Sequence, residues 1–303
     1  MRAFVLAAAL AALAGCGRNP EPPPPAGLPA PPELPAPADV KAAEDFAKDE
    51  FVELPPGGKA TLAWDLAKDL SHFYSSEEES YALLTTSARG ESTKIRMRGR
   101  NDGGAEFVGG GGGRGELFYK SAPRAEWIND QAVTSEKLNE IKPVVYRCLV
   151  REDGAFTDSR KMSGDTNYPM LDIYFALPGR GLEPGGRETR EIHVDAGAED
   201  FKYHGRQEIV HAGRRKVGRY ECVKLLSKVD VEVTAPFEGR GRLVGWVAGY
   251  FDSQARRFVR VDASLVLAVD LRRLMRPQDP TIEPFWNLVS TQYHTRVTLK
   301  LKD

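Results

Sequence analysis

The sequence has few of the residues that build metal sites and none of the common catalytic motifs. Its 303 residues include only three cysteines and five histidines. The histidines form neither HExxH nor an i,i+4 pair, and no Cys/His zinc spacing is present. A GxSxG nucleophile elbow and a Walker A sequence are also missing. We therefore predict no catalytic residue, no metal site and no dissociable cofactor.

Neither sign of charge dominates, and no apolar run is long enough to cross a membrane as a helix. Lys and Arg number 42 against 43 Asp and Glu, which gives no case for a nucleic-acid binder. Ala3–Leu13 is an uncharged run of eleven residues. At about 1.5 Å per helical residue it spans roughly half of a ~30 Å bilayer core. With Arg2 before it, this run is typical of a secretory signal peptide.

The residues that follow the run indicate a particular kind of export signal. Leu13-Ala14-Gly15-Cys16 resembles the lipobox of bacterial lipoproteins. The resemblance implies that residues 1–15 are cleaved between Gly15 and Cys16, and that the Cys16 thiol carries a covalent lipid anchoring the protein in the cell envelope. Because Gly17 rather than Asp follows, it implies the periplasmic side of the outer membrane where two membranes exist. The alternative is an ordinary signal peptide with an incidental cysteine.

A proline-rich segment separates this signal from the rest of the chain. Ten of the 21 prolines lie between Pro20 and Pro37, among almost no side chains that could form a core. Polyproline II at ~3.1 Å per residue makes twenty such residues a spacer of up to about 60 Å. We interpret residues 16–39 as the lipidated cysteine and its stalk, and a proline-rich docking ligand is the alternative.

Alternation of apolar and polar residues dominates residues 40–303. Between Arg257 and Leu271, every odd position from Val259 onward is apolar, which predicts a long strand with one buried face. The segments 221–233 and 289–301 show the same pattern. Shorter strands are predicted at 59–64, 80–86, 92–98, 115–120, 143–151, 170–176, 188–194 and 243–251.

The predicted fold class is mainly β, a large antiparallel meander curled into a barrel or half-barrel, because long antiparallel strands tend to curl. Two short helices are predicted, at 40–51 after Asp39 and at 136–141 after Ser135. The acidic run Glu77–Glu79 is interpreted as a solvated turn or edge. Turns are predicted at 184–186, 212–214 and 238–240.

Short motifs in the second half resemble exported, duplicated β-rich proteins of unknown function. They are Ala176-Leu177-Pro178 with Pro184-Gly185, Gly218-Arg219-Tyr220-Glu221-Cys222, and Gly249-Tyr250-Phe251-Asp252. The resemblance implies no activity. The folded part is one domain or two similar halves, 40–178 and 179–303. A broader analogy is the curved half-barrel of lipoprotein carriers and related lipid-binding proteins of the envelope.

Two cysteines remain for the folded part. An oxidising compartment permits a disulfide between Cys148 and Cys222. Strand phase places Cys148 on a face with Val150, whereas Cys222 shares its face with Lys224 and Lys228. Separate buried thiols are therefore the alternative.

The basic residues are unevenly spread. Residues 202–276 contain 16 Lys and Arg against 8 Asp and Glu. This excess suggests a surface for an anionic envelope partner, and a solvated basic face is the alternative. The residues of this candidate surface are Arg206, Arg214, Arg215, Lys216 and Arg219.

Together these patterns predict a membrane-anchored envelope lipoprotein with a β-rich domain that binds rather than catalyses. Its ligand would be a lipid-like molecule or a protein partner, and not nucleic acid. One alternative is a scaffolding protein that acts through the basic surface. A second is an envelope hydrolase built from scattered carboxyl groups.

The lipobox interpretation is tested by Cys16→Ser. Because a serine cannot form the thioether, the variant should leave the membrane fraction and become soluble after cell lysis. Immunoblotting of membrane and soluble fractions measures the change, with the unaltered chain as the control. A variant that stays in the membrane fraction would contradict the anchor.

Overall fold

The computed structural model describes residues 50–60, 62–88, 91–163, 170–179, 181–195, 201–235, 239–275 and 285–302. The predicted signal peptide, the stalk and all but the last two residues of the predicted helix at 40–51 lie outside the described residues. In the described ranges, no helix has the length and apolar character needed to span a bilayer.

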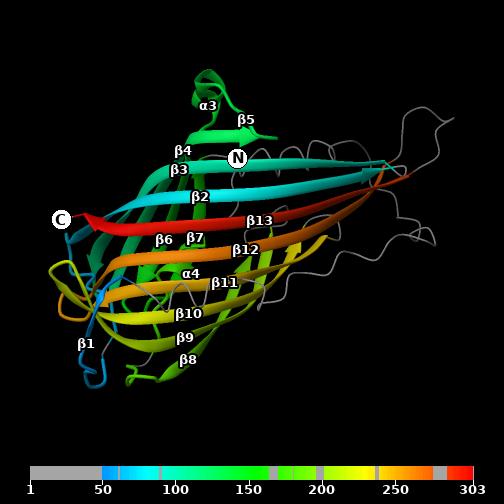
Figure 1. The fold of residues 1–303 in the computed structure, drawn as a ribbon. Coiled ribbons are helices and arrows are strands. Elements are labelled where there is room, and N and C mark those ends of the chain that lie inside the picture. Colours follow the sequence, from blue (N-terminus) through cyan, green and yellow to red (C-terminus); the bar gives the residue numbers. More distant parts are fainter. Residues whose placement is uncertain are drawn as a thin grey trace.

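One antiparallel sheet of thirteen strands forms almost all of the described structure (Figure 1). Its main order is β1-β9-β10-β11-β12-β13-β2-β3-β4-β6-β7, while β5 also pairs with β4 and β8 with β9. The strands are β1 (Val52–Leu54), β2 (Ser71–Ala88), β3 (Glu91–Gly111), β4 (Arg114–Ile128), β5 (Gln131–Ala132), β6 (Val144–Arg151), β7 (Phe156–Ser163), β8 (Arg187–Asp195), β9 (Lys202–Val217), β10 (Tyr220–Ala235), β11 (Gly239–Asp252), β12 (Arg257–Met275) and β13 (Phe285–Lys302).

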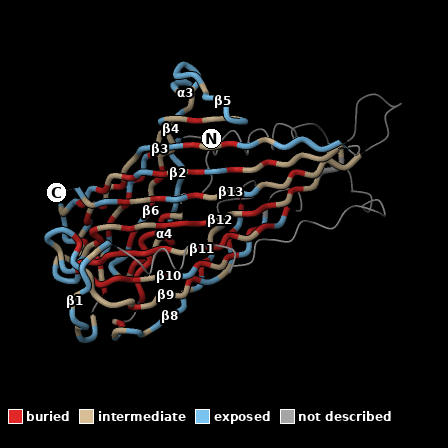
Figure 2. The backbone as a smooth tube through the Cα atoms, in the orientation of Figure 1, coloured by how far each residue is buried: buried red, intermediate tan, exposed pale blue. Residues whose placement is uncertain are grey.

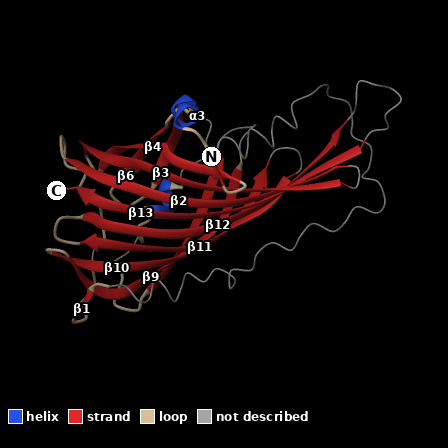
Figure 3. Cartoon of the chain, turned by 45° about the horizontal axis from the view of Figure 1, so that its top comes forward, coloured by secondary structure: helices blue, strands red, loops and turns tan. Residues whose placement is uncertain are grey.

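The sheet is curled but not closed, as the turned view shows (Figure 3). Within the described chain, β7 pairs only with β6 and β8 only with β9, so the two ends of the sheet remain separate. The predicted fold class is confirmed, in its half-barrel form.

The last strand of the chain pairs with its first long strand. β13 runs antiparallel to β2 over sixteen positions, from Asn287 opposite Ala88 to Lys302 opposite Phe73. This seam joins β8–β13, from residues 187–302, to β2–β7, from residues 71–163. The two parts of the chain therefore share one sheet and one concave face.

Alternate residues of each strand face the concave or the convex side, and buried positions recur along the strands (Figure 2). The alternation predicted for β12 holds from Val261 to Leu271. Val259 is an exception, because an irregularity in the register beside Tyr250 puts Phe258 on the concave face and Val259 in a convex cluster.

Glycines allow the sheet to bend tightly along β11. Gly241, Gly245 and Gly249 occupy inward positions of this strand. A Cβ atom at Gly249 would lie 2.5 Å from the Phe258 ring, and one at Gly241 would lie 2.4 Å from the Ala268 carbonyl oxygen. The Phe258 ring and the Ala268 carbonyl therefore occupy the places that side chains on β11 would need. Glycine permits such close approach, and in this way it allows a sheet to curve.

An irregular segment seals one end of the half-barrel. Residues 62–69 form backbone hydrogen bonds to the ends of three strand pairs: the N–H of Trp64 donates to the Glu152 carbonyl, that of Asp65 to the Arg256 carbonyl, and that of Asp69 to the Gly109 carbonyl. Trp64 is buried and stacks on Phe107 with ring centroids 4.2 Å apart. Aromatic pairs of this kind contribute about 0.5–1.5 kcal/mol beyond area burial. The six rings at this end are Trp64, Tyr74, Phe107, Phe175, Phe251 and Phe258.

Two predicted strands are wrong because their apolar residues line the interior instead of pairing. The segment 170–176 contains the one-turn helix α4 (Leu171–Tyr174), whose Leu171, Ile173 and Tyr174 are all buried inside the curl. A segment enclosed on every side is apolar without a strand period. The segment 59–64 contributes only an isolated bridge between Ala60 and Leu182.

The predicted second helix is confirmed, whereas the turn predicted at 212–214 is not. Helix α3 (Ser135–Glu140) confirms the predicted second helix, but Thr134 rather than Ser135 occupies its N-cap. The turn predicted at 212–214 is wrong: Gly213, with φ of +92°, lies within β9. The pairing of β9 with β10 changes register at this point, between Val223 and Leu225 of β10. Gly213 therefore accommodates a β-bulge, and β9 continues past it.

The packing at Gly249 predicts a large effect of one methyl group. Gly249→Ala should destabilise the fold by about 1–3 kcal/mol, because the new Cβ must displace the Phe258 ring. Gly58→Ala is the matched control, since no heavy atom lies within 4 Å of the place that its methyl group would take. Urea unfolding measures both, and equal midpoints for the two variants would contradict the close packing at Gly249.

Candidate functional site

A row of polar side chains interrupts the apolar concave face at the β13–β2 seam. Thr295 on β13 lies opposite Ser80 on β2, Ser80 lies opposite Gly99 on β3, and Gly99 lies opposite Glu126 on β4. We call these four residues the polar strip. Ser80 is 0% exposed, Glu126 3% and Thr295 4%. A register shift beside Arg100 brings Glu126 to the concave side.

Glu78 adds a second buried carboxyl group next to the polar strip. It lies two residues before Ser80 on β2, is 2% exposed, and its Oε1 accepts a hydrogen bond from the Tyr293 hydroxyl at 3.3 Å. The interpretation of Glu77–Glu79 as a solvated turn or edge is therefore wrong, because the run lies within a paired strand and its middle residue is buried. Glu79 is on the outer face, where its Oε1 accepts from Arg100 Nε at 3.0 Å.

The sequence did contain a signal for this site. On β2, Tyr74, Ala82 and Leu84 share the face of Ser76, Glu78 and Ser80, and all of them are buried. Extending the period of two from the apolar positions through the acidic run would have turned Glu78 inward. Glu126 carried no such signal, because the register shift changes its phase.

The hydroxyl groups of Ser80 and Thr295 are buried without a hydrogen-bond partner in the described chain. An unpaired buried hydroxyl costs about 1–3 kcal/mol. Most buried polar side chains in folded proteins are paired, so two adjacent exceptions indicate that the hydrogen bonding of this strip is incomplete.

An apolar row lies directly beside the polar strip. It crosses five strands in register and consists of Leu267, Tyr293, Ala82, Met97 and Ile128. We call it the apolar strip. Leu267, Tyr293 and Ile128 are only partly buried while they pack against the core. The concave face thus places hydrogen-bonding groups next to hydrocarbon, an arrangement suited to an amphipathic molecule.

His72 and His294 have lowered pKa values, and of these two only His72 has a carboxylate, that of Asp65, acting on it. Burial, reinforced by nearby Arg257, lowers the pKa of His72, which lies among the aromatic rings at the sealed end. On the convex face, Ser264 Oγ lies 2.9 Å from His294 Nε2. Burial and then Arg296 lower the pKa of His294, whereas a catalytic triad places a carboxylate beside the histidine.

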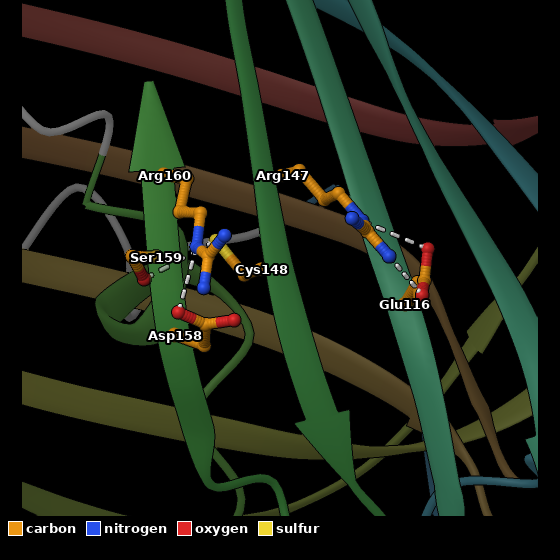
Figure 4. Close-up of polar contacts among 6 residues, drawn as sticks. All are labelled: Glu116, Arg147, Cys148, Asp158, Ser159 and Arg160. Atoms are coloured by element: carbon orange, nitrogen blue, oxygen red, sulfur yellow. Dashed lines mark hydrogen bonds and ion pairs between the residues drawn. The ribbon is translucent and has the colours of Figure 1, made fainter. Parts of the chain in front are cut away.

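The two cysteines lie on opposite faces of the sheet as separate buried thiols. Cys148 on β6 belongs to the concave core, and Cys222 on β10 belongs to the convex cluster. Both are free, so the alternative to the Cys148–Cys222 disulfide describes the structure. Ser159 Oγ on β7 donates to Cys148 Sγ on β6 at 3.3 Å, and Arg147, the residue before Cys148, forms an ion pair with Glu116 on β4 (Figure 4).

Most of the predicted basic surface is neutralised locally. Three of its arginines form ion pairs: Arg206 Nε with Glu191 at 3.3 Å, Arg214 Nη2 with Glu221 at 2.7 Å, and Arg215 Nη1 with Glu53 at 3.3 Å. The Arg219 guanidinium lies over the Tyr220 ring at 5.1 Å. Lys216 lies opposite Val52 of β1. These contacts fit the solvated face better than an anion-binding surface.

Gly15 and Cys16 lie outside the described residues. Across the ranges that the structure covers, no group of three or more His, Cys, Asp or Glu could hold a metal ion.

Comparisons with known proteins give no assignment to a family. No family and no curated protein matches the sequence. A DUF1329 family protein from Desulfovibrio piger is similar with a TM-score of 0.13 and 12% identity, over 72% of this chain and 83% of that chain. Pseudomonas aeruginosa OccK11 (OpdR) is similar with a TM-score of 0.19 and 8% identity, over 80% of this chain and 100% of that chain. These values place the chain in neither fold.

The buried thiols give a test of the core. Burial raises the pKa of Cys148 to about 11 and that of Cys222 to about 12. Since the reactive thiolate is scarce below these values, neither thiol should react with dithiobis-nitrobenzoate near neutral pH, and two per chain should react once guanidinium unfolds the protein. The Cys16→Ser chain removes the third thiol from the count. Rapid reaction of either thiol in the native protein would contradict its burial.

Proposed function

We propose that this protein is a lipid-anchored protein of the cell envelope that binds an amphipathic, lipid-like molecule on the concave face of its sheet and catalyses no reaction. The observation that carries the proposal is the apolar strip beside the polar strip. Both cross the β13–β2 seam, and both face the inside of the curl.

The apolar strip supplies the hydrophobic part of the binding surface. Leu267, Tyr293 and Ile128 retain some exposure, whereas the residues at the sealed end, such as Trp64 and Phe107, are fully packed. Burial of apolar surface contributes about 25 cal/mol per Å², or ~0.8 kcal/mol per methylene group. A hydrocarbon chain along this strip would therefore gain several kcal/mol.

The shape of the sheet supports entry of a ligand. Its ends, β7 and β8, are unpaired with each other in the described chain, so a path into the curl need not break a β-ladder. A proline-rich segment of the type found at 16–39 would hold this face away from the lipid surface while Cys16 anchors it. The proposal therefore includes the lipid anchor and the proline-rich segment, which together would keep the domain close to a membrane from which it could take lipid.

Binding is tested with the unlipidated Cys16→Ser chain purified without detergent. Its organic extract should contain a co-purifying lipid by mass spectrometry, and the folded protein should enhance the fluorescence of N-phenyl-1-naphthylamine. Leu267→Ser should weaken binding of this dye by about tenfold, since it removes hydrocarbon from the apolar strip.

Val266→Ser is the matched control, because Val266 is also partly buried but belongs to a convex cluster. It should leave dye binding unchanged. The proposal fails if the extract holds no lipid and the dye does not bind, or if both variants bind equally well.

A further inference from the structure

We infer that the polar strip recognises the head of the bound amphiphile, and that this head is a positively charged hydrogen-bond donor such as a primary ammonium group. This inference rests on the proposed function, because it names the class of ligand that the concave face takes.

The first argument is the incomplete hydrogen bonding of Ser80 and Thr295. Their hydroxyls are neighbours across the seam, where opposite Cβ atoms in a sheet lie about 4.5–5.5 Å apart. Neither bonds to the other or to any other described residue. Each hydroxyl offers acceptor lone pairs, and a group with several N–H donors placed between them could satisfy both.

The second argument is the glycine that lies between a hydroxyl and a carboxyl group in the register. Gly99 follows Ser80 in the register and separates it from Glu126. Because glycine has no side chain, Gly99 itself places no side-chain atom between the Ser80 hydroxyl and the Glu126 carboxyl group. With strands about 4.8 Å apart, Ser80 and Glu126 lie on strands whose axes are roughly 10 Å from each other.

The third argument is the sign of the charge. Glu78 and Glu126 are buried on either side of Gly99. From Val261 to Leu271 of β12, and at the positions of β13, β2, β3 and β4 that pair with them in register, the inward residues include no Lys or Arg. Carboxyl groups accept hydrogen bonds from N–H donors, and an ammonium group offers three such donors with a charge that a carboxyl group favours over an anionic head.

The fourth argument is the direction of the chain attached to the head. The apolar strip begins one inward row beyond the polar strip on every strand from β13 to β4. A head between Ser80 and Glu126 therefore places its hydrocarbon chain against Ala82, Met97 and Ile128. One amphipathic molecule can therefore form hydrogen bonds with the polar strip and apolar contacts with the apolar strip.

The test compares three probes with the same chain and different heads: dodecylamine, dodecanol and dodecanoate. Displacement of N-phenyl-1-naphthylamine from the Cys16→Ser protein measures each affinity near neutral pH, where the amine is protonated. We expect dodecylamine to bind about tenfold more tightly than dodecanoate. Equal affinities for all three would overturn the inference and leave the proposed function standing, whereas failure of all three to bind would overturn the proposed function.

Two sets of variants locate the head. Glu126→Gln should reduce the preference for dodecylamine over dodecanoate by about fivefold or more, whereas Glu79→Gln, on the outer face of the same sheet, should not change it. The double variant Ser80→Ala with Thr295→Val should weaken dodecylamine binding by about fivefold but unfold at an equal or higher urea concentration, because it removes unpaired buried hydroxyls.

This combination separates a binding role from a structural one. Purely structural hydroxyls would lower the unfolding midpoint when removed and would not alter the ranking of the three probes. That outcome, or an unchanged preference in Glu126→Gln, contradicts the assignment.

Discussion

The pairing of β13 with β2 is the interaction on which the rest of the structure depends. It brings together residues as distant in the chain as Glu78 and Tyr293, which are 215 positions apart and share a hydrogen bond. Closing so long a loop costs conformational entropy before any contact is made. The sixteen paired positions of the seam and the shared concave core offset this cost. Without the seam, the polar and apolar strips would each be divided between two separate surfaces.

The two ends of the concave face have different physical character. At one end, the aromatic rings are packed together and the segment 62–69 forms hydrogen bonds to the ends of the strands. There the Tyr74 hydroxyl also donates to the Phe258 carbonyl oxygen at 2.9 Å. At the seam, hydroxyls remain unpaired and apolar residues remain partly exposed. A packed end can hold the shape of the sheet while the other end keeps groups that a ligand could satisfy. Under the proposed function, stability and binding would depend on different residues of one surface.

Much of the strand content could be predicted because side-chain alternation is a local property. The segments around 221–233, 257–271 and 289–301 lie within β10, β12 and β13. The failures have identifiable causes. Val259 changes face at an irregularity in the ladder, Gly213 bends a strand without ending it, and residues 170–176 are apolar because the curl encloses them. None of these depends on local propensity alone.

The β-rich class, the antiparallel meander and the alternation of inward and outward residues could all be predicted from the amino-acid order, since each follows from spacing along the chain. The contact of Ser80 with Thr295 across the seam and the inward position of Glu126 could be seen only once the strands were paired in the folded chain. Register between strands depends on packing and bulges that involve residues far apart in sequence. The residues of the candidate site are neighbours almost entirely through such pairings, and for that reason no sequence motif indicated the site.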